Sequence, residues 1–398
     1  MNVLAALLPL LILAPSDSRL NNVRMGLFTL FKPEALEVRV TSAEGASLAA
    51  AGVAGALSIE HGELISIRLS GGQLHITLSG GRKLVATEVR VMPAGSTALE
   101  LNLPGSIKRA VRGDLQVDTG SGGRGPLRIV LTTDREAAVA SVVAAESGQQ
   151  ETEALKSLAL VVRTFMLSHQ GRHASEGFDF CDTTHCQFYR GEQDVSEAAS
   201  WLAVERAVAA TRGEFLAFEG RTVEGYYTAA CGGMTVTPSM LWGGTTNYPY
   251  RRISCRWCRG SRFDKWERSA AAAQVVHALS DSIGKKLLPS VELAMQRDRS
   301  SGFVRSVIIT DGTTHTTLTA DAFRRAIGLK MGWNTVLSPT FTIERRGDRF
   351  IFRGRGFGSQ IGLCEAGAVA QAAAGRTYRE ILRFYYPGAE IRGTSAHE

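Results

Sequence analysis

The sequence predicts an α+β fold, and three observations carry this prediction. From residue 23 to about residue 119, apolar and polar residues alternate with a period near two, as in LEVRV, ELISIRLS and KLVATEVRV. After residue 150, apolar residues instead recur every three or four positions, which is typical of helices. Strand-like and helix-like segments then mix without a regular βαβ alternation, which favours α+β over α/β.

The strand-like segments predict an N-terminal β-rich region over residues 23–120, mainly antiparallel because glycine-rich turns separate its strands. The run DTGSGGRGP is predicted as a loop or linker, and a mixed region follows over residues 121–393. In that region we expect helices in EALKSLALVVRTFMLSH, SEAASWLAVERAVAATRG, DAFRRAIG and YREILRFYY. A hairpin is expected to turn at Glu219 and Gly220, and strands are expected in TFTIERRGDRFIFRGRG.

The first residues, MNVLAALLPLLILAPSDSRL, contain an apolar run of the length of a signal-peptide core, too short to span a bilayer as a helix. We therefore expect residues 1–15 to be a signal peptide or N-terminal anchor, the only membrane contact, with a buried terminal strand or helix as the alternative. An extracytoplasmic location follows, and it would permit disulfides among the six cysteines.

Composition limits the partners. A chain of 398 residues with 44% hydrophobic residues can bury a substantial core. Its formal net charge of +7 is spread thinly, which suits a polyanionic surrounding such as a cell wall, a lipid surface or nucleic acid. The sequence has no basic stripe with interleaved aromatic residues, so nucleic acid is not expected as a partner.

Glu146, in VVAAESGQQ, is the candidate general acid. It ends an apolar run, where we expect a strand-to-helix junction that presents the side chain in a cleft. A carboxyl among apolar groups resists ionisation, so its pKa should rise toward the range useful for donating a proton. The alternative from spacing alone is a solvated loop residue.

The stretch FDFCDTTHCQFYRG packs two cysteines and a histidine into six consecutive positions. These are Cys181, His185 and Cys186. They could bind a metal, form a disulfide or only pack, and the residues alone do not decide between zinc and a disulfide. A closed zinc site needs a fourth ligand, for which His173 is the nearest upstream candidate. Cys255 and Cys258, in RRISCRWCRG, could instead complete a sulfur site or form a disulfide.

Several long motifs run through residues 109–392. They are VVAAES, EALKSLALVVRTF, FDFCDTTHCQFYRG, AVAATRGEFLAFEGRTVEGYYTAACGGMT, SGFVRSVIITDG, ADAFRRAIG, GRGFG and REILRFYYPGAEI. In content and order they resemble the stage II sporulation protein D (SpoIID) family, also called the amidase-enhancer domain. Its characterised members are lytic transglycosylases, which cleave peptidoglycan glycan strands that lack stem peptides.

The resemblance implies the same activity here, with peptidoglycan glycan strands, and in addition a cell-wall amidase, as partners. Glu146 matches the family's catalytic Glu. Arg163 matches an Arg of the alanine-rich helix, where a guanidinium could orient Glu146 or hold the acyl groups of the sugar. Tyr226 and Tyr227 could line a sugar groove, although tyrosines on a half-buried strand commonly just pack.

The resemblance also implies a cofactor. Family members can carry zinc in the CDTTHC region, which favours a structural zinc held by Cys181, His185 and Cys186.

Two residues depart from the family pattern in GFGSQIGLCEAGA. Ser359 stands where His is expected, and Glu365 stands where Gln is expected. A Ser cannot carry a proton near neutral pH, so activity could be reduced or lost. The alternative function is therefore a non-catalytic, glycan-binding stimulator of a cell-wall amidase. A zinc-dependent hydrolase is not expected, because the sequence has no HExxH-like pair.

Overall fold

The computed structural model describes residues 21–95, 98–120, 125–148, 151–192, 198–244, 248–312 and 315–393. Helices and strands mix in this part of the chain, and its N-terminal third is an antiparallel β region, so the predicted α+β class is confirmed. The segment expected to be a signal peptide or anchor, residues 1–15, lies outside the described residues. Within the described ranges, no helix is long and apolar enough to cross a membrane.

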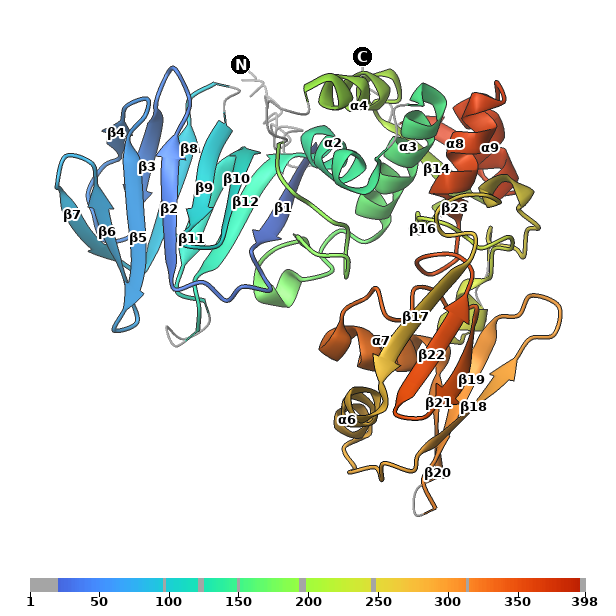
Figure 1. Cartoon of the computed structure of the whole chain (residues 1–398). Helices are drawn as coiled ribbons and strands as arrows, with labels where there is room; N and C mark the ends of the chain where they lie inside the picture. Colours follow the sequence, from blue (N-terminus) through green and yellow to red (C-terminus); the bar gives the residue numbers. More distant parts are fainter. Residues whose placement is uncertain are drawn as a thin grey trace, which may run out of the picture.

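Residues 22–134 form an N-terminal β lobe (Figure 1, blue to cyan). Its strands are β1 (Asn22–Leu27), β2 (Ala35–Val40), β3 (Ala46–Ala50), β4 (Leu57–Ile59), β5 (Leu64–Ser70), β6 (Gln73–Leu78), β7 (Lys83–Ala86), β8 (Glu88–Pro93), β9 (Ala98–Leu103), β10 (Ile107–Arg112), β11 (Asp114–Asp118) and β12 (Arg128–Asp134). One sheet has the order β10-β9-β2-β5-β6-β7. The other has the order β13-β1-β12-β11-β8-β3-β4, and β13 (Phe180–Cys181) joins its edge in parallel with β1. Alternate residues of β2 and β5 are buried, and both sheets contribute to one core.

A group of helices forms the centre of the molecule beside this lobe (Figure 1). They are α2 (Arg135–Glu146), α3 (Thr152–Ser168), α4 (Ala198–Ala210), α8 (Glu365–Ala373) and α9 (Tyr378–Tyr385). Helix α3 packs against the other four, which explains why it is apolar on almost every side. Short strands complete this central lobe. They are β14 (Glu214–Phe218), β15 (Arg221–Thr222), β16 (Tyr227–Thr228), β23 (Leu363–Cys364) and β24 (Glu390–Gly393).

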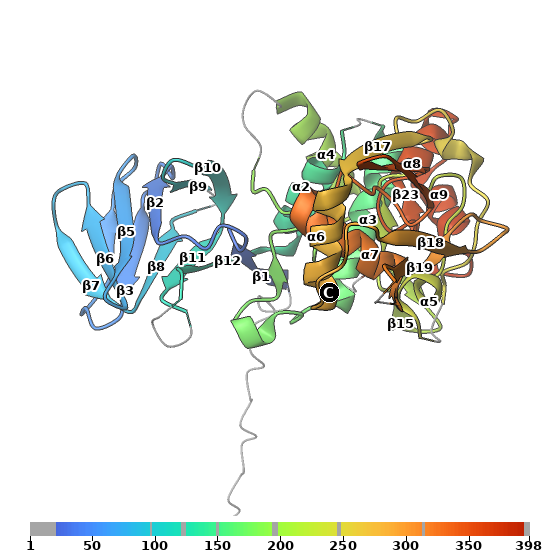
Figure 2. The same cartoon turned by 60° about the horizontal axis from the view of Figure 1, so that its bottom comes forward.

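The chain leaves the central lobe after α5 (Pro238–Trp242), builds an inserted lobe and returns to β23. The inserted lobe contains β17 (Trp266–Ala271), α6 (Ala272–Ile283), β18 (Glu292–Arg297), β19 (Val304–Thr310), β20 (His315–Thr319), α7 (Ala320–Met331), β21 (Phe341–Arg346) and β22 (Arg349–Gly354). It has its own hydrophobic core, separate from the core shared by the β lobe and the helices. Figure 2 shows α6 and α7 well away from the β-lobe strands β5, β6 and β7. The boundaries expected from the sequence, 1–15, 23–120 and 121–393, stay a prediction, and the inserted lobe falls inside the third range.

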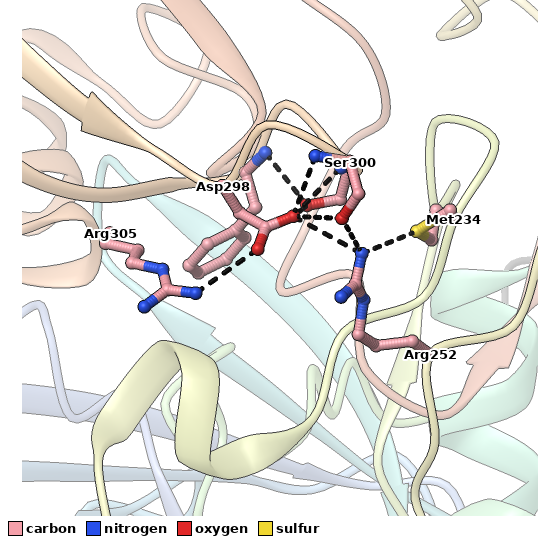
Figure 3. Close-up of polar contacts among 7 residues, drawn as sticks. Met234, Arg252, Asp298, Ser300 and Arg305 are labelled. Carbon is pink, nitrogen blue, oxygen red and sulfur yellow. Dashed lines mark hydrogen bonds and ion pairs between the residues drawn. The ribbon is translucent and has the colours of Figure 1, made fainter.

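A polar network attaches the inserted lobe to the loop that follows α5 (Figure 3). Arg252 points out of this loop, and its Nη2 lies 3.3 Å from Asp298 Oδ1 and also contacts Ser300 Oγ. Asp298 Oδ2 accepts a further hydrogen bond from Arg305 Nη2 at 3.2 Å. Hydrogen bonds from Ser300 and Ser301 hold the pKa of the Asp298 carboxyl well below its usual range. One carboxylate therefore orders the turn between β18 and β19 and connects it to the loop that follows α5.

A buried carboxylate joins the β lobe to the loop after β13. Asp182 Oδ2 accepts hydrogen bonds from the Phe28 backbone N–H at 2.7 Å and from Arg109 Nη1 at 2.6 Å. Asp182 Oδ1 accepts from the Thr29 hydroxyl at 2.8 Å. The Arg109 guanidinium lies 4.7 Å from the centre of the Phe28 ring. Both charged side chains are less than one-tenth exposed, so each depends on the other for compensation of its charge.

We predict that Asp182→Ala lowers the free energy of unfolding by about 3–5 kcal/mol, because it leaves the Arg109 guanidinium buried without a carboxylate. Urea denaturation followed by circular dichroism measures this change. The control is Glu390→Ala, which removes an exposed ion pair with Arg392 and should cost less than about 1 kcal/mol. Equal losses in the two variants would contradict the structural role of Asp182.

Candidate active site and metal-ligand clusters

Helix α2 presents Glu146 as its last residue. The helix begins after Asp134, whose Oδ1 accepts backbone N–H bonds from Glu136 at 2.9 Å and Ala137 at 3.3 Å. The strand-to-helix junction expected at Glu146 is wrong, because the apolar run before it forms a buried stretch of helix α2 rather than a strand. At the carboxyl end of a helix, the negative end of the dipole disfavours an ionised carboxyl.

Glu146 is half-buried and receives two hydrogen bonds. The Tyr227 hydroxyl donates to Glu146 Oε1 at 3.2 Å, and the Phe188 backbone N–H also donates to the carboxylate. Burial raises the pKa of Glu146, and these two hydrogen bonds oppose the rise only in part. The direction is the one that a proton donor requires.

Tyr227 reaches this carboxyl because of a close backbone approach. Gly225 has a φ of +66°, and a Cβ at this position would lie 2.4 Å from the Phe165 backbone nitrogen of α3. Only glycine lets the chain pass so close to the helix. Neighbouring side chains of an extended segment point to opposite sides, so Tyr226 faces away from Tyr227 and packs beside Tyr250, with ring centres 5.5 Å apart.

The segment that returns from the inserted lobe lies near the same carboxyl. Burial and the negative charge of Glu146 raise the pKa of Glu365, the first residue of α8, to about 8, and the positive charge of Arg262 opposes this rise. Burial and then the charges of both carboxylates raise the pKa of Tyr227 as well. Ser359 lies in the preceding turn, where its hydroxyl oxygen accepts a backbone N–H at 3.3 Å. Both departures from the family pattern therefore fall in this returning segment.

The Arg163 side chain binds the carboxylate of Glu136 rather than that of Glu146. Its Nη2 and Nε bind the two carboxylate oxygens of Glu136 at 2.6 and 2.7 Å, and its Nη1 donates to the Glu214 carbonyl at 2.9 Å. The expectation that Arg163 orients Glu146 directly or holds a sugar is not met by this geometry, because its side chain is 1% exposed and its nitrogens already have partners. Its effect is indirect, since Glu136 lies in the first turn of the helix that ends at Glu146.

The CDTTHC loop gathers four metal-ligand side chains. They are His173, Cys181, His185 and Cys186, and their ligand atoms all lie within 4.8 Å of one another. Cys186 Sγ lies 3.3 Å from His173 Nε2, and Cys181 Sγ lies 3.7 Å from His185 Nδ1. A hydrogen bond from Cys186 is the largest contribution that lowers the pKa of the Cys181 thiol, to about 4. Nitrogen and sulfur ligands of one tetrahedral zinc lie about 3.6 Å apart, so donor set and spacing fit this metal.

The remaining four cysteines form a second cluster. They are Cys231, Cys255, Cys258 and Cys364, and their sulfur atoms also lie within 4.8 Å of one another. All six cysteines of the chain are described and free, so the disulfides considered from the sequence do not form here. His173, rather than Cys255 or Cys258, completes the first cluster. Cys231 and Cys364 were missed as ligand candidates, although a Cys-x-x-Cys pair with two cysteines left over was a usable signal.

Two hollows in the described surface lie away from Glu146. One, of about 550 Å³, is lined by residues of β17, β21 and β22, including Trp266 and Arg353. The other, of about 230 Å³, is lined by residues of α2 and α4 with Tyr189. Glu146 lines neither of them, so the cleft expected at this carboxyl does not coincide with either hollow.

Comparison with known proteins finds a family model that matches the part of the chain containing Glu146. Residues 124–218 match the SpoIID family model, described as stage II sporulation protein. Residues 124–218 are thus similar to the SpoIID family. Glu146, Arg163 and the CDTTHC loop lie within the matched range, whereas Tyr227, the four-cysteine cluster and Glu365 follow it.

Curated relatives extend the similarity beyond the SpoIID match. An uncharacterized protein of Brachyspira hyodysenteriae is 28% identical over 240 residues, which cover 60% of this chain and 61% of that protein. Stage II sporulation protein D of Bacillus subtilis is 27% identical over 270 residues, 65% of this chain and 74% of that protein. The Bacillus subtilis protein named amidase enhancer is 22% identical over 284 residues, 60% of this chain and 38% of that protein. The resemblance drawn from the motifs is thus confirmed.

We predict that Tyr227→Phe raises the pKa of Glu146, because the lost hydroxyl hydrogen bond stabilises the ionised carboxylate. Carbon-13 NMR titration of the Glu146 carboxyl, assigned with Glu146→Gln, measures the change. Tyr226→Phe is the matched control, since the neighbouring ring packs with Tyr250 instead, and it should leave the titration where it is. An unchanged pKa in Tyr227→Phe would show that this hydrogen bond has no part in tuning the acid.

Proposed function

We propose that this protein is a lytic transglycosylase that cleaves denuded peptidoglycan glycan strands and leaves 1,6-anhydro-muramic ends. The environment of Glu146 carries the proposal: a half-buried carboxyl at the carboxyl end of a helix, with a raised pKa and a tyrosine hydroxyl on one oxygen. Its place within the SpoIID match, and the relatives named stage II sporulation protein D, support a role on the cell wall.

A single carboxyl suffices for this reaction. Protonated Glu146 donates its proton to the glycosidic oxygen as the bond between that oxygen and the anomeric carbon breaks. The 6-hydroxyl of the same muramic sugar forms the new bond to the anomeric carbon, and its proton passes to the Glu146 carboxylate. The acid is thereby regenerated and no water is consumed. Attack within one sugar also gains from proximity, whereas hydrolysis by a glycosidase needs a second carboxylate as base or nucleophile.

Zinc belongs to this proposal as a structural ion. His173, Cys181, His185 and Cys186 would hold it with all four tetrahedral positions taken by side chains, which leaves none for water or substrate. The ion would supply folding energy rather than chemistry. The zinc ion would also help to position Glu146, because the loop that the ion would close continues directly to Phe188, whose N–H binds Glu146.

An extracytoplasmic location and a cell-wall amidase as partner remain part of the proposal. The net charge of +7 suits an anionic wall. The relative named amidase enhancer supports a second candidate, a glycan-binding module without catalysis. Ser359 and Glu365 favour this second candidate, since both depart from the family pattern and the charge of Glu365 interacts with the proposed acid.

We predict that Glu146→Gln lowers the formation of anhydro-muramic ends on denuded strands by at least ~100-fold, because an amide keeps the shape but cannot donate the proton. Mass spectrometry of the digested strands measures the products. Glu151→Gln is the control, because Glu151 stands at the N-terminal boundary of α3 in the same connection and its carboxyl makes no capping hydrogen bond, so turnover should be unchanged.

Two outcomes separate the candidate functions. Near-full turnover of Glu146→Gln would overturn the assignment of the acid. Glycan binding without turnover in the wild type would favour the amidase-stimulating module.

In an active enzyme, kcat/KM should fall as pH rises through the raised pKa of Glu146, since only the protonated carboxyl starts the reaction. The charge of Glu365 interacts with this carboxyl, whereas the Tyr227 hydroxyl, whose pKa is raised well above its usual range, contacts it as a neutral donor.

For the first cluster, we predict that Cys181→Ser removes one zinc ion per chain and lowers Tm, because a closed four-ligand site contributes folding energy. Elemental analysis and differential scanning fluorimetry measure the two effects. Thr184→Ala, at an exposed position of the same loop, is the control and should keep its metal. Unchanged zinc content in Cys181→Ser would contradict this ligand assignment.

A further inference from the structure

The four-cysteine cluster lies where the inserted lobe joins the central lobe. Cys231 follows β16, and Cys255 and Cys258 lie on the chain that leaves toward the inserted lobe. Cys364 lies on the chain that returns, as the residue that precedes α8. Their exposures are 0%, 0%, 1% and 0%, so three separate segments bury their thiols at one point.

The distances between these sulfur atoms suit a metal better than disulfides. All four lie within 4.8 Å of one another, and Cys231 Sγ and Cys258 Sγ are 3.5 Å apart. A disulfide needs about 2.05 Å between its sulfur atoms. Sulfur atoms at the corners of a tetrahedron around zinc, each about 2.3 Å from the metal, lie about 3.8 Å apart. The observed spacing is close to that value.

The surroundings provide donors suited to thiolate sulfur. The Cys231 backbone N–H donates to Cys364 Sγ at 3.2 Å, and the buried Tyr385 hydroxyl lies 3.3 Å from Cys255 Sγ. A Cβ at Gly367 would lie 2.1 Å from the Tyr385 oxygen and 3.1 Å from Cys255 Sγ, so the absence of a side chain there makes room for this arrangement. Partners of this kind orient metal ligands and stabilise their charge.

We propose that Cys231, Cys255, Cys258 and Cys364 bind a second zinc ion, in a tetrahedral four-sulfur site. Zinc replaces the thiol protons, which pass to solvent, and all four positions on the metal are taken by protein, so the site is structural. Packing alone does not explain the cluster, because buried cysteines that only fill space as small hydrophobic residues need not direct all their sulfur atoms to one point.

The consequence is a fixed junction between two lobes. The site links the outgoing and returning chains of the inserted lobe to the segment that follows β16. Strand β16 itself carries Tyr227. Backbone bonds join the same segments, from Cys255 N–H to the Gly233 carbonyl at 3.0 Å and from Phe357 N–H to the Ala230 carbonyl at 2.8 Å. The metal closes this junction whether or not the protein is an enzyme, so the inference does not depend on the proposed function.

Metal content of the full chain tests this inference. Protein purified without added chelator should contain about two zinc ions per chain by native mass spectrometry and elemental analysis, one for each four-ligand site. Cys258→Ser should lose one ion and Cys181→Ser the other, and the double variant should lose both. Ser254→Ala, an exposed neighbour in the same turn as Cys255, is the matched control and should keep both. If Cys258→Ser does not fold, cobalt substitution of the wild type provides a second readout, since a four-thiolate site gives stronger sulfur-to-metal charge-transfer absorption than a site with two thiolates.

Four results would overturn the inference. One is a single zinc ion per wild-type chain, lost in Cys181→Ser. Another is iron with visible charge-transfer absorption in place of the second zinc, since four cysteines can also hold an iron–sulfur cluster. The third is a wild-type mass lowered by the loss of thiol hydrogens, which would mean disulfides among these cysteines. Two zinc ions retained in Cys258→Ser would equally exclude this ligand set.

Discussion

The burial of the Asp182 carboxylate is the constraint on which the proposed site depends. This carboxylate binds Arg109 and the backbone N–H of Phe28, and these bonds fix the CDTTHC loop on the β lobe. The loop then continues over α2, where the Arg190 backbone N–H donates to Ser141 Oγ at 3.2 Å. Between these two attachments lies the peptide N–H that binds Glu146. The β lobe is therefore part of what positions the acid.

The two cysteine clusters hold different segments around Glu146. The side chains of the first lie in and beside the loop that supplies the Phe188 N–H, and those of the second come from the segments next to Tyr227 and Glu365. These segments contain strands of only two residues, which have too few ladder hydrogen bonds to be rigid on their own. Metal ions at the two proposed sites would supply the rigidity instead, and a general acid needs its partners held within fractions of an ångström.

The environment of Glu146 contains some groups that favour its protonated form and others that favour its carboxylate form. Burial and its place at the end of α2 favour the protonated form, whereas the Tyr227 hydroxyl and the Phe188 N–H favour the carboxylate. A group that must donate and then accept a proton benefits from such a balance. Glu365 adds a second buried carboxyl whose charge is felt by the same tyrosine. An amide at that position, as the family pattern has it, would remove this repulsion.

The sequence by itself determined the α+β class, the strands β2, β5 and β6 and the long helix α3, because periodicity depends on neighbouring residues in the chain. Its long motifs carried the family resemblance, which singled out Glu146 as the proposed acid. It misplaced the element before Glu146, since an apolar run of that length suits a buried helix as well as a strand. Only the tertiary structure decided which carboxylate Arg163 binds, which four residues make each metal-ligand cluster, and that Tyr227 rather than Tyr226 meets the acid. These are contacts between residues up to 133 positions apart, as between Cys231 and Cys364, and no local pattern encodes which distant side chains will share one point in space.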